Sequence, residues 1–456
     1  MAHNRIFIGH FFIRILAGAA ALSMNAAAQQ KQSLTVEQSI QIGLENSKSL
    51  HSSLMKVEAA DAKSGETNAS RLPTVRVGGS YTRLSDVPPF DLGPFPPFVN
   101  EPVTISPSVL NNYTLRLSVQ QPLFTGMRLT GSSDVAGYMA EATSQDFTHD
   151  RAELIYSIKA SYWNLYKVLE FKKVIDENVE QMKAHLKDVQ NMAAQGLVTK
   201  NEVLKVEVQL SNAELMQIDA RNNVQLAMIG LNNIVGLPLN TEIDPASTIQ
   251  PQKEKQYGEP AELIRQALNQ RPEVKSTELR VKAGESAVTV ARSGWFPQIY
   301  LTGNYYYARP NQRLFPTQDK FQDTWDVTLS ASLDIWNWGT TIHQTNQAQA
   351  QLAQARDALD QLKDGISLEV TQSFLNFNQS RERIAVAEKG VRQAEENLRI
   401  TNEKFKAGLT LNSDLLDAEV ALLQAKWNSI QALIDHELSD ARLQKAIAMD
   451  NSAVKQ

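Results

Sequence analysis

The stretch AAQGLVTKNEVLKVEVQLSNAELMQI at residues 193–218 is matched later in the chain by FKAGLTLNSDLLDAEVALLQAKWNSI at residues 405–430. A second match joins residues 36–75 to residues 260–299. A unit this long is half of a protein, and not the repeat of about 20–50 residues that builds a solenoid. We therefore expect two equivalent halves that together form part of a wall or ring.

The repeat divides the chain into four parts. Residues 1–28 read as a secretory signal peptide, because an apolar stretch follows two arginines and ends at the small residues Ala26-Ala27-Ala28. A membrane anchor, the alternative, needs about 20 apolar residues, and this run is shorter. The first repeat then covers 29–235, a connector covers 236–258, and the second repeat covers 259–456. We expect the connector, rich in Pro and polar residues, to lie on the surface.

Composition excludes several classes of function. The chain has no cysteine, so disulfides and cysteine metal sites are ruled out. A net charge of −5 gives no reason to expect nucleic acid as a partner. The seven histidines are scattered, and we find neither a phosphate-binding glycine loop nor a nucleophile elbow. We expect no catalytic residue, no metal site and no cofactor.

Four segments alternate strictly between apolar and polar residues, which predicts strands with one apolar face. They form two hairpins, 73–124 and 297–336, and the segments are 74–81, 113–120, 298–308 and 324–335. Runs of about 10 residues suit a tilted strand that crosses a bilayer, whereas soluble strands average about 5–6. A half-buried sheet on a soluble core is the alternative.

A lipid-facing sheet of four strands cannot close by itself, because unpaired edge groups in hydrocarbon cost several kcal/mol each. The sheet therefore needs other copies of the chain. Aromatic residues at the base of the second hairpin fit a membrane-interface belt. They are Trp295, Phe296, Trp336 and Trp338.

Most of the remaining chain is predicted to be helical. Two proline-free segments predict rods of roughly 65 residues, about 100 Å long. Each rod ends at a Gly-Leu turn, and the chain returns through a helix of about half the rod's length. A second short helix, which leads into a strand, is expected to stack end to end on the first, so that the two together match the length of the rod. The expected helices are 35–71, 126–192, 199–233, 261–294, 339–406 and 411–447.

Several short motifs, in the same order in both halves, resemble the TolC-type outer membrane efflux proteins. They are LTVEQSI at 34–40, RLP at 71–73, QPLF at 121–124, ALNQRPEV at 267–274, FP at 296–297, DIWNWG at 334–339, KFKAGL at 404–409 and DLLDA at 414–418. The resemblance implies an α+β membrane protein that forms a homotrimer. Each chain would give four strands to a 12-stranded outer-membrane barrel that continues into a 12-helix periplasmic tunnel.

The resemblance also implies a gate. Asp414 and Asp417 match the aspartates that ring the periplasmic constriction in the family, although a solvated acidic helix face is the simpler interpretation of two such residues. The first half places Glu202 and Lys205 there, so the symmetry is broken. Asn201 adds a polar neighbour. At the positions where the family's better-known member has a locking tyrosine and arginine, this chain has Phe405 and Thr410.

The turns between the long and short helices carry a second implied role. Glycine supplies the positive φ of such turns, and by resemblance the same tips dock a periplasmic adaptor protein. The residues concerned are Gly196, Leu197, Ala407, Gly408 and Leu409.

The sequence thus predicts a passive exit duct in the outer membrane of a Gram-negative bacterium. It would serve a tripartite efflux pump or a type I secretion system, with a periplasmic adaptor and an inner-membrane transporter of the RND, ABC or MFS type. A soluble periplasmic coiled-coil adaptor or tether is the alternative, and it leaves the four bilayer-length strands unexplained.

Overall fold

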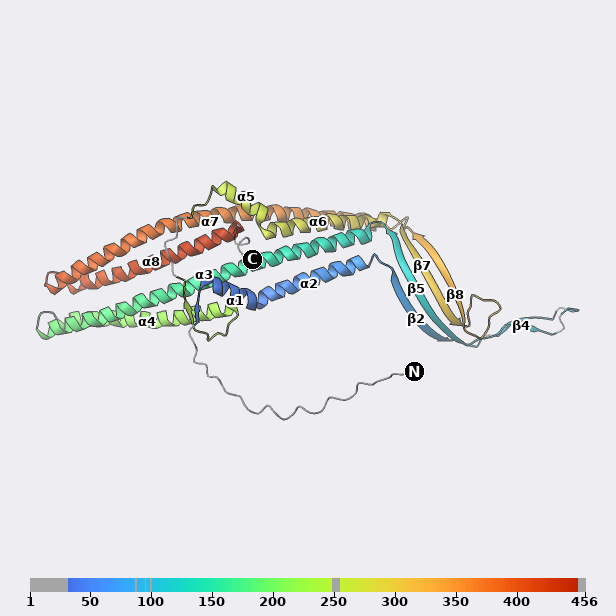
Figure 1. The fold of residues 1–456 in the computed structure, drawn as a ribbon, viewed down its shortest axis with the longest axis horizontal. Helices are drawn as coiled ribbons and strands as arrows, with labels where there is room; N and C mark the ends of the chain where they lie inside the picture. Colours follow the sequence, from blue (N-terminus) through green and yellow to red (C-terminus); the bar gives the residue numbers. More distant parts are fainter. Residues whose placement is uncertain (1–31, 87, 95, 99–100, 248–254, 450–456) are drawn as a thin grey trace, which may run out of the picture.

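The molecule is elongated, and its long helices and its main β-sheet follow one another along the long axis (Figure 1). The computed structural model describes residues 32–449 apart from 87, 95, 99–100 and 248–254. The predicted signal peptide lies outside the described residues. The turns that join the long and short helices lie at one end, and a β-sheet lies at the other (Figure 1).

Two helices of 67 residues each, α3 and α7, form the rods. The α4 and α2 helices lie end to end along α3, as α8 and α6 do along α7 (Figure 1). The predicted rods and returns are confirmed to within a few residues. The helix bounds are α1 Val36–Asn46, α2 Lys48–Ala69, α3 Arg128–Ala194, α4 Lys200–Val235, α5 Pro260–Gln270, α6 Pro272–Arg292, α7 Thr340–Lys406 and α8 Asn412–Ala446.

The prediction of single helices over 35–71 and 261–294 is wrong, because each is broken near its start. Ser47 is extended, and its side chain accepts from the backbone N–H of Leu50, so it ends α1 and caps α2. Arg271 is extended because Pro272 follows it, and proline disfavours the helical conformation of the residue before it.

Four strands form one antiparallel sheet in the order β2-β5-β7-β8. They are β2 Thr74–Arg83, β5 Asn111–Thr125, β7 Gln298–Arg309 and β8 Gln322–Ser332. The register pairs Val77 with Leu117, and Tyr305 with Trp325, so the predicted apolar residues share one face. The strands have the predicted alternation, but β5 is longer than expected and β8 ends before Leu333.

The prediction that the connector lies wholly on the surface is also wrong. Its segment Ile243–Pro245 forms β6, which pairs in parallel with β1, Gln32–Leu34. Ile243 is fully buried. Two further short strands, β3 Phe90–Leu92 and β4 Val103–Ser106, pair within the long loop of the first hairpin.

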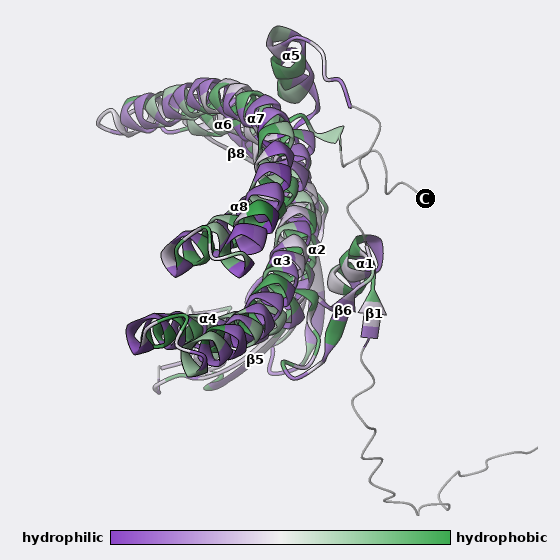
Figure 2. Cartoon of the chain, turned by 90° about the vertical axis from the view of Figure 1, so that its left-hand side faces the viewer, coloured by the Kyte–Doolittle hydropathy of each residue, from purple (hydrophilic) through white to green (hydrophobic). Residues whose placement is uncertain are grey.

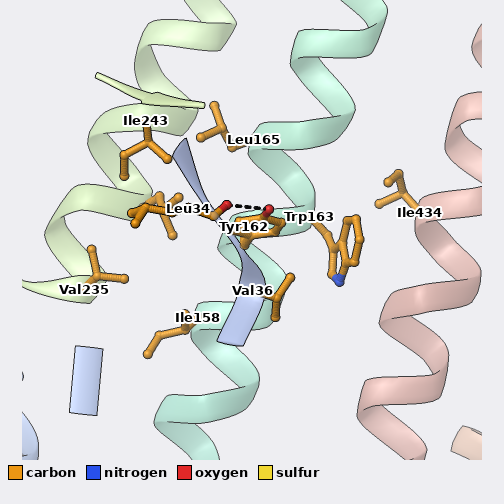
Figure 3. Packing of buried hydrophobic residues seen from close by; sticks show 10 residues of the cluster. Leu34, Val36, Ile158, Tyr162, Trp163, Leu165, Val235, Ile243 and Ile434 are labelled. Carbon is orange, nitrogen blue, oxygen red and sulfur yellow. Dashed lines mark hydrogen bonds between the residues drawn. The ribbon is translucent and has the colours of Figure 1, made fainter. Parts of the chain in front are cut away.

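The core of the helical part is divided into separate clusters along the rods. In the cluster of Figure 3, the hydroxyl of Tyr162 donates to the carbonyl of Leu34 at 2.9 Å and accepts from the backbone N–H of Ser247. This buried tyrosine therefore ties α3 to β1 and to the connector between the two halves. Seen along the long axis, the helices form a curved row with mixed polar and apolar surfaces (Figure 2).

None of the helices in the described part of the chain is long and apolar enough to cross a membrane.

Candidate functional site

The two helix turns have the same backbone geometry. The N–H of Leu197 donates to the carbonyl of Met192 at 2.9 Å, and the N–H of Leu409 donates to that of Lys404 at 2.9 Å. Gly196 and Gly408 supply the positive φ angles of +75° and +73° that this helix ending requires. The leucine of such a turn often packs back on its helix. Here both leucines are exposed, 66% and 77%, which leaves an apolar side chain at each tip.

The structure places Asp414 and Asp417 on the exposed face of the first two turns of α8. Leu415 and Leu416 between them are buried, which fixes the direction of the acidic face. The carboxylate of Asp414 accepts from Oγ1 of Thr410 at 2.5 Å and from the N–H of Leu411 at 3.2 Å. These two donors lower the pKa of Asp414, so it carries its negative charge at neutral pH.

Asn201 and Asp417 lie on opposite walls of a groove of about 440 Å³ between α4 and α8. Lys205 lines the same groove, which therefore carries both signs of charge. Thus Asp417 and Asn201 line one groove, while Asp414 bonds within its own turn.

Glu202 does not join that groove and bonds to the other half of the chain instead. Its carboxylate accepts from Nζ of Lys205 at 2.9 Å and from Nδ2 of Asn412 at 3.1 Å. These donors lower the pKa of Glu202. Oδ1 of Asn412 in turn accepts a 2.8 Å hydrogen bond from Nε2 of His185 in α3. One asparagine thus joins α3, α4 and α8.

Phe405 packs against the first half of the chain, whereas Thr410 has a partner in its own turn. Phe405 is buried, with its ring centroid 5.5 Å from that of His185, and Thr410 donates to Asp414. His185 and Asn412, which the sequence alone did not single out, hold this end of the two halves together. The sequence did contain a signal for His185, because at helical spacing this residue lies on the same face of α3 as the buried Val179, Met182 and Val189.

Further contacts continue the seam between α3 and α8 away from the tips. Nε2 of Gln181 donates to Oε1 of Glu419 at 3.2 Å, whereas Oε2 of this buried glutamate has no partner among the described residues. Burial raises the pKa of Glu419 to about 7. The ring centroids of Phe171 and Trp427 lie 4.2 Å apart further along. The seam therefore contains one carboxyl that titrates near neutral pH.

The four aromatic residues predicted at the membrane interface lie together where the sheet meets the helices. All four are about half exposed or more, and the rings of Trp336 and Trp338 pack edge to face at 5.9 Å. Side chains of this size left exposed together are unusual for a water-facing surface.

The chain is similar to known proteins in sequence and in fold. A family model described as "Outer membrane efflux protein" matches residues 39–237 and 263–448. The outer membrane efflux protein BepC of Brucella suis is 23% identical over 70% of each chain. The outer membrane protein TolC of Escherichia coli is 21% identical over 96% of this chain and 86% of its own. The alkaline protease secretion protein AprF of Pseudomonas aeruginosa is 24% identical over 73% and 69%.

Solved structures share the fold. The channel CusC superposes with a TM-score of 0.78 at 17% identity, over 91% of this chain and 92% of its own. The outer membrane protein VceC of Vibrio cholerae superposes with a TM-score of 0.76 at 18% identity, over 90% and 95%.

Proposed function

Because this chain belongs to the outer membrane efflux protein family, we propose that it is the outer-membrane exit duct of a tripartite efflux pump or a type I secretion system. Its place is the outer membrane, and the family match leaves no support for a soluble adaptor. One observation carries the proposal: a bilayer-length sheet with an exposed apolar face continues directly into rods of about 100 Å. A protein with this shape can cross the outer membrane and extend into the periplasm.

The sheet supports a barrel made by several chains. Its outer strands β2 and β8 each pair on one side only among the described strands. In hydrocarbon such edges must be paired, so we infer that β8 of one copy pairs with β2 of the next. Three copies of four strands give 12 strands, enough to enclose a lumen.

The helices support closure of the same ring. Neighbouring helices follow the lateral orders α2-α3-α6-α7 near the sheet and α4-α3-α8-α7 near the tips. Large exposed apolar residues concentrate on the edge helices: among described residues seven lie on α4 and five on α7, against one each on the inner helices α3 and α8. The α7 edge of one copy would cover the α4 edge of the next, a head-to-tail contact that closes into a ring.

The gate that we propose lies at the tips. In a trimer, Asp414 and Asp417 would present six carboxylates around the narrow end, and a ring of acidic residues attracts cations. The bonds of Asn412 to Glu202 and His185 would hold this end closed. A periplasmic adaptor that binds the exposed Leu197 and Leu409 would compete with that closed state, with energy supplied by an inner-membrane transporter of the RND, ABC or MFS type.

Cell fractionation of the full-length chain tests this function. We expect it in the outer-membrane fraction, extractable only with detergent. On a gel it should run as a trimer before heating and as a monomer after heating. Release into the soluble periplasmic fraction without detergent would contradict the proposal.

A further inference from the structure

The polar face of the sheet carries an excess of positive charge. The charged residues on this face of the four strands are Arg76 in β2, Arg116 in β5 and Asp326 in β8. Arg313, in the turn after β7, reaches the same face, where it bonds to Asp326 at 2.5 Å. Three guanidinium groups therefore face one carboxylate.

Arg116 is held in a fixed orientation by neutral neighbours. Its Nε and Nη2 donate to Oδ1 of Asn304 at 3.0 and 2.7 Å. The ring of Tyr306 lies under two guanidinium groups, 5.3 Å from that of Arg116 and 4.4 Å from that of Arg313. Asn304 also donates to Asp326 at 2.7 Å, so the network crosses β5, β7 and β8. This bonding orders the guanidinium of Arg116 but does not neutralise it.

The opposite side of Arg116 is open. Its partner in the register is Gly78 of β2, and a Cβ placed there would meet no atom within 4 Å. Arg76 pairs with Ser118, two residues from Arg116, so the two arginines are diagonal neighbours on one face. Among the described residues, the side-chain hydrogen bonds of Arg116 go to the neutral Asn304, Arg76 has none, and neither arginine forms an ion pair. Two like charges in such positions repel each other unless an anion lies between them.

We propose that Arg76 and Arg116 form an anion-binding site on the lumen wall, repeated three times around the barrel. The inference rests on the proposed duct, because it takes the polar face of the sheet to be the lumen wall. Ordered guanidinium groups bind phosphate, sulfate and carboxylate through paired hydrogen bonds. A solute that passes through the duct then meets two charged regions, the acidic residues at the helix tips and the basic residues inside the membrane. The site favours cargo that carries anionic groups.

Block of single channels by inorganic tripolyphosphate tests the site. The full-length protein is inserted into phosphatidylcholine bilayers at about 0.1 M KCl, where screening lengths remain near 10 Å. We expect tripolyphosphate added on the external side to block the unmodified channel. The double variant Arg76→Gln with Arg116→Gln should need about tenfold more tripolyphosphate for the same block.

Two further variants make the outcome specific. Gly78→Glu places a carboxylate beside Arg116 while both arginines remain, so it should weaken the block as the double variant does. Arg309→Gln is the charge control, because Arg309 lies in the same sheet, three residues beyond Tyr306, the register partner of Arg116, but bonds to Asp319. It should leave the block unchanged.

The inference fails if the double variant conducts as a heat-labile trimer and is blocked as strongly as the unmodified channel, and the duct would then stand without this site. It also fails if Arg309→Gln weakens the block equally, since the effect would then be one of total charge. Absence of any channel in the unmodified protein would instead overturn the duct itself.

Discussion

Nε2 of His185 lies 2.8 Å from Oδ1 of Asn412, a buried hydrogen bond between the long helix of the first half and the returning helix of the second. Burial lowers the pKa of His185, so the ring is neutral and Nε2 carries the proton that it donates. The same asparagine donates to Glu202. The tips of the two halves are thus joined through one side chain.

Replacement of Asn412 should loosen this end of the molecule. Asn412→Ala leaves the buried ring of His185 without its acceptor, which costs about 1–3 kcal/mol. We expect a lower unfolding temperature and a larger single-channel conductance. Ser413→Ala changes the next residue and removes no described hydrogen bond, so it should alter neither. If the two variants have the same unfolding temperature and the same conductance, Asn412 does not stabilise the closed state.

The seam between α3 and α8 should respond to pH through Glu419. Its pKa of about 7 in the folded chain lies above the ordinary carboxyl value, so the folded state holds the proton more tightly. Stability should therefore fall as pH rises from about 4.5 to 7, by an amount on the order of 3 kcal/mol. Glu419→Gln should abolish this fall and raise the unfolding temperature at pH 8.

Glu395→Gln is the control for that experiment, since it removes an exposed carboxyl from the groove that Glu419 also lines. The pH profile of this control should match that of the unmodified protein. A profile of Glu419→Gln that still falls between pH 4.5 and 7 would contradict the role of Glu419.

Arg271 forms two ion pairs inside the helical part of the molecule. It is buried and bonds to Glu273 and Glu369, each at 2.6 Å. Burial alone would raise the pKa of Glu273, but the hydrogen bond with His149 and the charge of Arg271 hold it at about 2. Arg271→Ala should lower the free energy of unfolding by about 3–5 kcal/mol, measured by thermal unfolding, because it leaves the two partly buried carboxylates without their cationic partner. Arg265→Ala, at an exposed and longer ion pair of 3.8 Å, should change little.

The orientation of the sheet in the membrane can be tested with adjacent residues. Val327 lies on the apolar face of β8, and Thr328 on the polar face. An arginine on the lipid side costs about 2–4 kcal/mol near the bilayer centre, so Val327→Arg should lower the yield of heat-labile trimer. Thr328→Arg should assemble normally. The reverse order of yields would mean that the apolar face does not meet lipid.

Features with a repeating pattern could be predicted from the sequence. Alternation identified all four strands of the main sheet, and the Gly-Leu pairs at Gly196 and Gly408 marked both turns. The break at Arg271 also had a signal, since Pro272 follows it. The break at Ser47 had only a capping serine inside a continuous polar helix pattern, which many unbroken helices also contain.

Features made by contacts between distant segments could not be predicted. The pairing of β1 with β6 joins two strands of three residues each, too short for any alternation to show. The hydrogen bond of His185 to Asn412 depends on how two helices from different halves cross. The sequence identified Asp414 and Asp417 as acidic neighbours, but not the bond of Thr410 that orders one of them.

Single-channel recording of the full-length protein and of the double variant Asp414→Ala with Asp417→Ala tests the gated duct most directly. We predict discrete channels of low conductance that multivalent cations block from the side of the helix tips. The double variant should conduct more and lose most of that block, because the proposed ring of six carboxylates is gone. Channels that are unchanged in both respects, or no channels from a correctly assembled trimer, would contradict the gated duct.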